Sequence, residues 1–208
     1  LLEQELSEDS LKEYTQIIIN EADRLQNLMN RMLTPHQMPV YKKTNIHEIL
    51  ERVRSLILSE FSNDIAFIRD YDVSLPEFVI DREKLIQAIL NIARNAAQAM
   101  KRNNQDGMQL TFITRAERQI VFRKKKHATA IRIDIVDNGP GIKNELIDKI
   151  FFPLVTESEN GSGLGLSLAQ NLISLHQGMI DCHSVPGKTV FSIVLPIENN
   201  LKPAQEKK

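Results

Sequence analysis

Asn91 and Asn95 have a spacing that suits a metal–nucleotide complex. On a helix they lie one turn apart, with their side-chain amides about 5–6 Å from each other on one face. Mg²⁺ prefers hard oxygen ligands, and because a bound nucleotide supplies phosphate charge, two neutral amides are sufficient partners. Taken alone, the same pair also fits an ordinary solvated helix surface.

A second group with chemical potential is the segment 137–141, Asp-Asn-Gly-Pro-Gly, at the end of a predicted strand. Asp137 offers a carboxylate acceptor at a fixed position, and the exocyclic amine of a purine is a suitable donor for it. Gly139 and Gly141 permit backbone angles and close approaches that other residues do not. For these five residues alone, a simple turn after a strand is the alternative.

A third group is the glycine-rich segment directly before a predicted helix, with Gly161, Gly163 and Gly165 at alternate positions and Leu164 between the last two. Such glycines expose backbone N–H groups, and the helix N-terminus adds partial positive charge, which together are typical of a phosphate cradle. The segment matches neither a Walker A loop nor the Rossmann spacing. A flexible loop is the alternative.

The elements that must position these groups form a mixed pattern from residue 44 onward. Asn45 with Glu48, and later Asp81, are helix N-cap signals. The long helix after Asp81 carries a buried stripe on a face different from the two asparagines, at Leu85, Ile89, Ile92, Ala96 and Met100. A brief apolar stretch lies at 78–80, a further helix is predicted at about 164–176, and strands are predicted at 65–71, 108–114, 120–122, 131–135, 179–184 and 190–195. The sequence therefore predicts an α+β domain with largely antiparallel strands.

The pattern within residues 1–34 predicts one amphipathic helix, and a capping box at Ser10 marks where it begins. Apolar residues recur in it every seven positions, at Leu11, Ile18, Leu25 and Met32. Pro35 and Pro39 end the helix and mark 35–43 as a linker. A heptad stripe must pack against other helices, so we expect a partner helix upstream or on another chain. A surface helix packed on the following domain is the alternative.

The composition narrows the class of protein. The 208 residues carry 26 Lys and Arg against 27 Asp and Glu, a net charge of -1, which lacks the basic surplus typical of nucleic-acid binding. Cys182 is the single cysteine, and no apolar run reaches the roughly 18 residues of a membrane helix, so a cytosolic location is expected. The chain begins Leu-Leu without Met, which predicts a piece of a longer protein, and 199–208 is expected to be a loose tail after a domain at 44–198.

In this order, the three groups resemble the N, G1 and G2 boxes of the GHKL ATP-binding family. The segment 151–154, Phe-Phe-Pro-Leu, resembles the F box of histidine kinases, and 187–189, Gly-Lys-Thr, resembles their last glycine motif, with Lys188 in place of a glycine. The chain is identified as a sensor histidine kinase. This resemblance implies a two-layer α/β sandwich of the Bergerat type with a mixed, mainly antiparallel sheet, preceded by one helix of a dimerisation hairpin.

The resemblance also implies ATP and Mg²⁺ as cofactors and a role for each matching residue. Asp137 is expected to accept the adenine amine, Asn95 assisted by Asn91 to hold Mg²⁺ that bridges the phosphates, and the 161–165 lid to cover them. The implied ATP-binding residues are Asn91, Asn95, Asp137, Gly139, Gly141, Gly161, Gly163, Leu164, Gly165 and Thr189.

Position 91 separates classes within this superfamily. Its hydrolytic ATPases place a water-activating glutamate where this sequence has Asn91, so the resemblance favours phosphotransfer to a histidine. Gln98 departs from the Lys or Arg of many kinases, and Arg94 or Lys101 is the alternative phosphate contact. A nucleotide-sensing regulatory module and an anti-sigma-type serine kinase stay open as other functions.

The segments 21–25, 69–76 and 132–141 resemble the nitrogen-regulation branch of sensor kinases, and the likeness extends over nearly the whole chain. That family is cytoplasmic, forms homodimers through a helical hairpin, phosphorylates an NtrC-like response regulator and is steered by a PII-like signalling protein. The resemblance implies no nucleic acid and no membrane as direct partners.

The family's phosphoaccepting motif, His-Glu-x-x-Asn-Pro, is absent from the 208 residues. The five histidines lack that context and are expected to be structural or solvated: His36, His47, His127, His176 and His183. We therefore expect the chain to bind ATP·Mg²⁺ without autophosphorylating alone. The basic segment 123–127 is interpreted as a solvated hairpin turn, with a docking surface for an acidic partner as the alternative.

Overall fold

The computed structural model describes residue 15 and the ranges 39–61, 64–122, 125–156 and 162–197. The chain divides into two units, Leu1–Met38 and Pro39–Lys208, and the fold below is that of the second unit. The predicted helix at 1–34 lies outside the described residues except for Thr15, which is helical. Residues 35–38 of the predicted linker and the tail at 199–208 also lie outside them.

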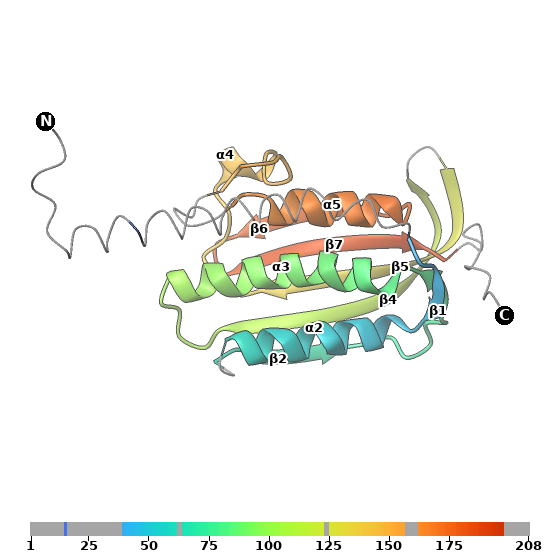
Figure 1. Cartoon of the computed structure of the whole chain (residues 1–208), viewed down its shortest axis with the longest axis horizontal. Helices are drawn as coiled ribbons and strands as arrows, with labels where there is room; N and C mark the ends of the chain where they lie inside the picture. The colour runs from blue at the N-terminus through green and yellow to red at the C-terminus, as the bar shows by residue number, and fades with distance from the viewer. Residues whose placement is uncertain (1–14, 16–38, 62–63, 123–124, 157–161, 198–208) are drawn as a thin grey trace, which may run out of the picture. The chain divides into compact units, whose positions relative to one another are not determined.

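Five strands form one sheet in the order β2-β4-β5-β7-β6 (Figure 1). β2 pairs with β4 in parallel, and the other three pairings are antiparallel, so the predicted mixed, mainly antiparallel sheet is confirmed. A separate two-stranded sheet joins β1 (Lys42–Thr44) to β3 (Phe78–Ile80). The strands of the large sheet are β2 Ala66–Asp70, β4 Gln109–Phe122, β5 Lys125–Asp137, β6 Met179–Val185 and β7 Lys188–Pro196.

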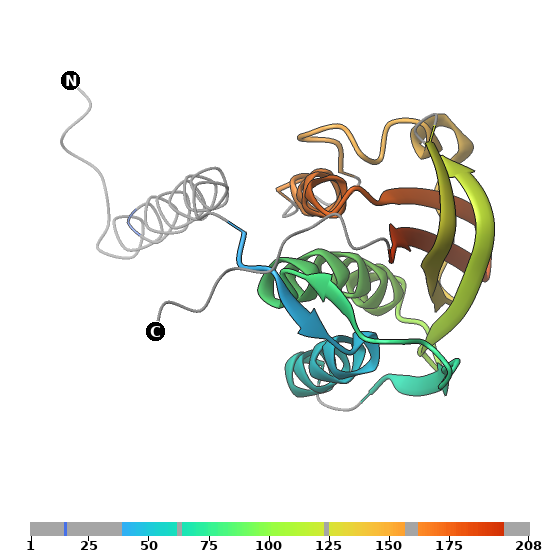
Figure 2. The ribbon, with the colours of Figure 1, turned by 90° about the vertical axis from the view of Figure 1, so that its right-hand side faces the viewer.

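Three helices cover one face of this sheet: α2 (Ile46–Glu60), α3 (Arg82–Arg102) and α5 (Gly165–Leu175) (Figure 2). The core lies between the two layers, because alternate residues of the central strands face the helices and are fully buried, including Leu110, Phe112, Ile131, Ile133, Ile135, Phe191, Ile193 and Leu195. The predicted two-layer sandwich is confirmed. Within the described part of the chain, no helix is long and apolar enough to cross a membrane.

The helix that carries the two asparagines begins as the sequence predicts. The Asp81 side chain accepts a hydrogen bond from the backbone N–H of Lys84 at 3.1 Å, which caps α3. Its predicted stripe from Leu85 to Met100 is buried. Asn45 caps α2 in the same way through the N–H of His47 at 2.9 Å. Local capping and the apolar period therefore fix where both helices lie.

Three local features differ from the predictions. β4 is one strand, with a single unbroken register against β5, so the predicted break between 114 and 120 is wrong. Residues 115–119 are mostly polar and mostly exposed, which hides the alternation, but the β5 partner supplies the ladder hydrogen bonds that keep the strand continuous. Lys42 and Lys43, placed in the linker by sequence, belong to β1, which is too short to show a period. The four-residue helix α4 (Asn144–Ile147) was not predicted.

Candidate functional site

Asp137 ends β5 on the face of the sheet that the helices cover, and only 5% of it is exposed. Its Oδ1 accepts a hydrogen bond from the N–H of Gly139 at 2.9 Å. Burial raises the pKa of this carboxyl, while hydrogen bonds from Gly139 and from the Thr189 side chain act in the opposite direction. A carboxylate this buried with so few donors has capacity to accept from a ligand.

The turn after β5 is closed by its two glycines. A Cβ on Gly139 would lie 2.7 Å from Asp137 Oδ1 and 3.2 Å from Met100 Cγ, and one on Gly141 would lie 3.0 Å from the backbone of Val185. Gly141 also has a φ of +85°, which favours glycine. The turn therefore packs its backbone against both α3 and the end of β6, which holds Asp137 in place.

Asn91 and Asn95 are half-buried on α3, beside the fully buried Ile92 and Ala96. The amide nitrogen of Asn91 is buried and has no hydrogen-bond partner among the described residues. A buried polar atom without a partner is uncommon in a folded domain. Because rotation of the amide exchanges its oxygen and nitrogen, Asn91 can present a hard oxygen donor. The two residues fit Mg²⁺ held mainly through nucleotide phosphates.

The basic residues near Asn95 have other partners. Arg94 makes a two-pronged ion pair with Glu60, with Nη2 and Nε at 2.7–2.9 Å from the carboxylate oxygens. The Lys101 ammonium lies 5.8 Å from the centre of the Phe61 ring. Gln98 is exposed. Without nucleotide, the Arg94 guanidinium therefore binds Glu60, and a phosphate contact from Arg94 or Lys101 stays a prediction.

The glycine-rich segment enters α5 through a turn that requires glycine at position 163. Gly163 has a φ of +63°, and a Cβ there would lie 2.5–2.8 Å from the backbone of Leu154 and Val155. The Gly163 carbonyl also accepts a hydrogen bond from the Leu154 N–H at 3.0 Å. Gly165 begins α5 in open space, and Leu164 precedes it. Gly161 lies outside the described residues.

The elements that carry the predicted residues contact one another. α3 meets the β5 turn where Met100 faces Gly139, and α3 packs against α5, which begins at the glycine-rich segment. Thr189 of β7 pairs directly with Asp137 of β5. Ser184 of β6 was missed by sequence analysis, although the strand register places it opposite Thr189 at 2.9 Å between hydroxyl oxygens. Only the register, which the sequence does not show, points to Ser184.

Two of the histidines have structural partners, as expected. His176 is buried, and its ring joins the Leu172 carbonyl at 2.7 Å to the Asp81 N–H at 3.2 Å. His47 bonds to the Thr114 hydroxyl at 3.0 Å and stacks on Tyr71. Burial lowers the pKa of both rings. No group of three or more His, Cys, Asp or Glu residues arranged for a metal occurs among the described residues.

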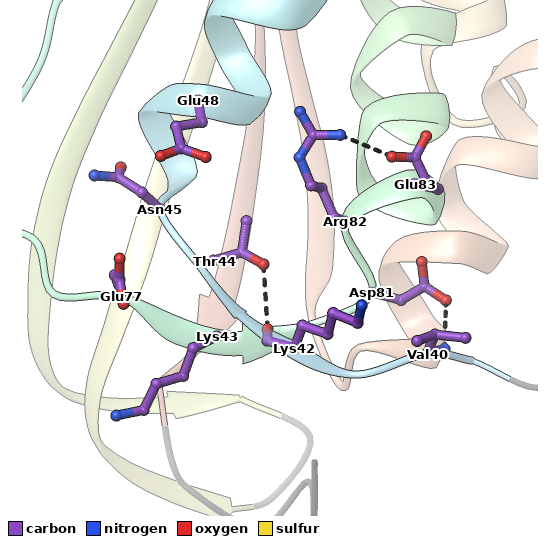
Figure 3. A pocket seen from close by; sticks show the side chains of 10 residues that line it. All are labelled: Val40, Lys42, Lys43, Thr44, Asn45, Glu48, Glu77, Asp81, Arg82 and Glu83. Carbon is purple, nitrogen blue, oxygen red and sulfur yellow. Dashed lines mark hydrogen bonds and ion pairs between the residues drawn. The ribbon is translucent and has the colours of Figure 1, made fainter. Parts of the chain in front are cut away.

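A pocket of about 600 Å³ lies at the other end of α3, where α2 and α3 begin (Figure 3). Some of its polar groups bind one another: Arg82 pairs with Glu83 at 2.7 Å, and Asp81 accepts from the Val40 N–H at 2.9 Å. It is lined by Val40, Lys42, Lys43, Thr44, Asn45, Glu48, Glu77, Asp81, Arg82 and Glu83. None of the predicted ATP-binding residues lines it.

The fold and the site define a class of ATP-binding domain. Residues 80–199 match the family model of histidine kinase-, DNA gyrase B- and HSP90-like ATPases, and the chain belongs to this family. Within it, the chain is 47% identical over 197 residues to the sensory histidine kinase/phosphatase NtrB of Vibrio alginolyticus. The match covers 95% of this chain and 56% of that protein, so the chain spans little more than half the length of this curated relative.

Solved structures show the same fold. Full-length ShkA in complex with AMPPNP superposes with a TM-score of 0.67 at 21% identity, over 97% of this chain and 42% of that one. The histidine kinase ThkA in complex with the response regulator TrrA superposes with a TM-score of 0.66 at 23% identity, over 96% and 55% of the two chains. The resemblance read from the three sequence motifs is therefore confirmed at the level of family and fold.

Proposed function

We propose that this chain is the ATP-binding catalytic portion of a two-component sensor histidine kinase of the NtrB type. The proposed reaction moves the γ-phosphoryl group of ATP to a histidine and then to an NtrC-like response regulator, with phosphatase activity in the whole protein. The observation that carries the proposal is the buried Asp137 carboxylate beside a backbone turn closed by Gly139 and Gly141. The 47% identity to an NtrB protein supports the branch.

Asp137 recognises the base in this proposal. Its ionised carboxylate accepts a hydrogen bond from the exocyclic amine of adenine in a buried setting, where such a bond discriminates against a base without that donor. The N–H groups around Gly163 to Gly165 and the N-terminus of α5 bind phosphate oxygens. The two regions would therefore bind opposite ends of one nucleotide, the base and the phosphates.

Mg²⁺ is the proposed metal, and the residues present fit it because Asn91 has an unpartnered buried amide. Asn95, assisted by Asn91, would hold the ion together with the phosphates, and the bound ion supplies positive charge that offsets the charge of the triphosphate. The same two amides cannot act as a general base. The site therefore favours retention of ATP for transfer over activation of water.

The proposed partners follow from the relatives. ThkA, which shares the fold, was solved with a response regulator, and an NtrC-like regulator is the counterpart we propose here. We also propose a homodimer formed through a helical hairpin that includes residues 1–34, a PII-like regulatory partner and a cytoplasmic location.

The proposal can be tested with ATP radiolabelled at the γ-phosphate. The 208-residue chain with Mg²⁺ is incubated with and without a separately prepared phosphotransfer hairpin of an NtrB relative. We expect acid-labile label on the hairpin histidine and none retained by the chain alone. A hairpin whose acceptor histidine is changed to glutamine is the matched control and should stay unlabelled.

The same experiment separates the alternatives. Acid-stable label on a serine of a supplied protein would indicate a serine kinase. Rapid release of inorganic phosphate without transfer would indicate a hydrolytic ATPase, and ATP binding with neither reaction would indicate a nucleotide-sensing module. Label transferred to the hairpin is the one result that supports the histidine kinase.

A further inference from the structure

Three hydroxyl and carboxyl side chains form a row across adjacent strands beside the adenine site. Ser184 of β6 pairs with Thr189 of β7, and Thr189 pairs with Asp137 of β5. All three are buried, with exposed fractions of 6%, 3% and 5%. Because they occupy one register row of an antiparallel sheet, their side chains lie on the same face.

The direction of the hydrogen bonds along this row is set by chemistry. The Ile142 N–H donates to Ser184 Oγ at 2.9 Å, because a backbone N–H can only donate. At the other end, the Thr189 hydroxyl donates its single hydrogen to the Asp137 carboxyl, a bond that lowers the pKa of that group against the effect of burial. The 2.9 Å bond between Ser184 and Thr189 must then use the Ser184 hydrogen.

The row is thus a one-way relay that runs from the Ile142 N–H through Ser184 and Thr189 to Asp137. Ile142 directly follows Gly141, so the relay also ties the turn after β5 to the end of β6. Chains of hydrogen bonds in a dry interior strengthen one another, and each hydroxyl here has its one hydrogen committed. Removal of Ser184 would leave the Thr189 hydroxyl free to rotate away from Asp137.

We propose that Ser184 is a positioning residue for adenine recognition: it directs the Thr189 hydroxyl onto Asp137, which leaves a lone pair of that carboxylate aimed at the exocyclic amine. This inference rests on the proposed function, since it assumes that Asp137 binds the amine. Ser184 itself has no role in phosphate or metal binding, because its hydroxyl contacts only Ile142 and Thr189 in the described part of the chain.

The test compares two nucleotides by calorimetry on the 208-residue chain. ATP and purine riboside triphosphate differ in the exocyclic amine, which the second lacks. For Ser184→Ala we expect ATP to bind about 5- to 10-fold more weakly, the size of one lost hydrogen-bond contribution, and purine riboside triphosphate to change less than about twofold. A merely structural role would weaken both nucleotides equally and would overturn the proposal.

A matched pair of variants removes the effect of altered packing. Ser184→Thr and Ser184→Val give branched side chains of nearly the same shape, but only threonine keeps a hydroxyl for the relay. We expect Ser184→Thr to retain more of the preference for ATP over purine riboside triphosphate than Ser184→Val. Equal preferences in the two variants would refute the relay even if Ser184→Ala were too unstable to measure.

Binding of the two nucleotides to the unmodified chain separates a failure of the proposed adenine site from a failure of the relay. If it binds both nucleotides equally, Asp137 does not bind the amine and the proposed adenine site fails, together with the relay. If it prefers ATP and Ser184→Ala prefers ATP to the same extent, the adenine site stands and the relay alone is refuted.

Discussion

Asp81 and Asp137 are both almost fully buried, yet they lie at opposite ends of α3 and differ in how their oxygens are used. In Asp81, Oδ1 accepts from the Lys84 N–H and Oδ2 accepts from the Val40 N–H. Asp137 has one backbone donor, Gly139, and one hydroxyl donor, Thr189. Both oxygens of Asp81 therefore accept from the protein's own backbone, whereas one of the two donors to Asp137 is a side-chain hydroxyl.

The surroundings of the two carboxylates also differ. Near Asp81, the backbone N–H of that residue donates to His176, and Tyr41 packs edge-on against the His176 ring. These contacts join the segment before β1 to the end of α5. Near Asp137, the glycines of the turn allow the backbone to pack closely against the carboxylate, Met100 and the end of β6. One end of α3 joins elements of the fold through these contacts, and the other is the end at which we propose that the nucleotide binds.

The largest expected effect concerns Asp137. Asp137→Ala should weaken ATP binding by about 1.5–3 kcal/mol, roughly 10- to 150-fold, because a charge-assisted hydrogen bond to the base is lost. Titration calorimetry measures the affinity, and thermal unfolding should show a retained fold. Asp134→Ala is the control, since Asp134 lies on the other face of β5 and binds Arg132 and Ser192. Equal ATP affinity for wild type and Asp137→Ala would refute the adenine role.

Asp81→Ala should show the reverse. Loss of the α3 cap should lower the free energy of unfolding by about 1–2 kcal/mol, measured by denaturant titration, while the ATP affinity stays within about twofold. Asp81→Asn keeps an acceptor for Lys84 but loses the one for Val40, so it should be intermediate. A large loss of ATP binding in a folded Asp81→Ala variant would break the contrast between the two ends of α3.

A smaller effect on ATP affinity is expected at the glycine-rich segment before α5, where two glycines provide a matched pair of variants. Gly163→Ala forces a Cβ to within 2.5–2.8 Å of the backbone of Leu154 and Val155 at a positive φ. The strain of about 1–2 kcal/mol should displace the segment and weaken ATP binding by about fivefold. Gly165→Ala meets nothing within 4 Å and should change the affinity little. Equal affinities for the two variants would argue against a phosphate role for this turn.

The smallest expected effect is on the pH dependence of stability without nucleotide. Burial raises the pKa of Asp137 in the folded chain, so the folded state binds more protons than the unfolded one between the two pKa values. The free energy of unfolding therefore falls as pH rises through that window. Asp137→Asn should remove this slope, and its unfolding temperature should exceed that of wild type increasingly as pH rises. An identical slope in both proteins would contradict the burial cost assigned to Asp137.

The sequence alone predicts Asp81 as a helix cap and Asp137 as a binding residue, because each lies beside a recognisable local pattern. Asp81 precedes an apolar helical stripe, and Asp137 follows an alternating strand and precedes two glycines. The order of the three motifs then predicts the family, because the ATP site is assembled from those same three segments. Local signals suffice where a residue's role depends on neighbours in the chain.

The rest depends on contacts between distant segments, which a single sequence does not display. The continuity of β4 comes from the partner strand β5, and the role of Ser184 comes from its register against Thr189. The pairing of Arg94 with Glu60, 34 residues apart, is likewise a contact that the sequence does not display. Each of these features needs the sheet or the helix pair to form before it exists.

The most direct test of the contrast is a crystal structure of this chain with Mg²⁺ and a non-hydrolysable ATP analogue. We expect the adenine amine at hydrogen-bond distance from the Asp137 carboxylate and the phosphates beside the start of α5, with the pocket near Asp81 empty. A nucleotide seated in that pocket, or an adenine amine bound to a group other than Asp137, would contradict the account.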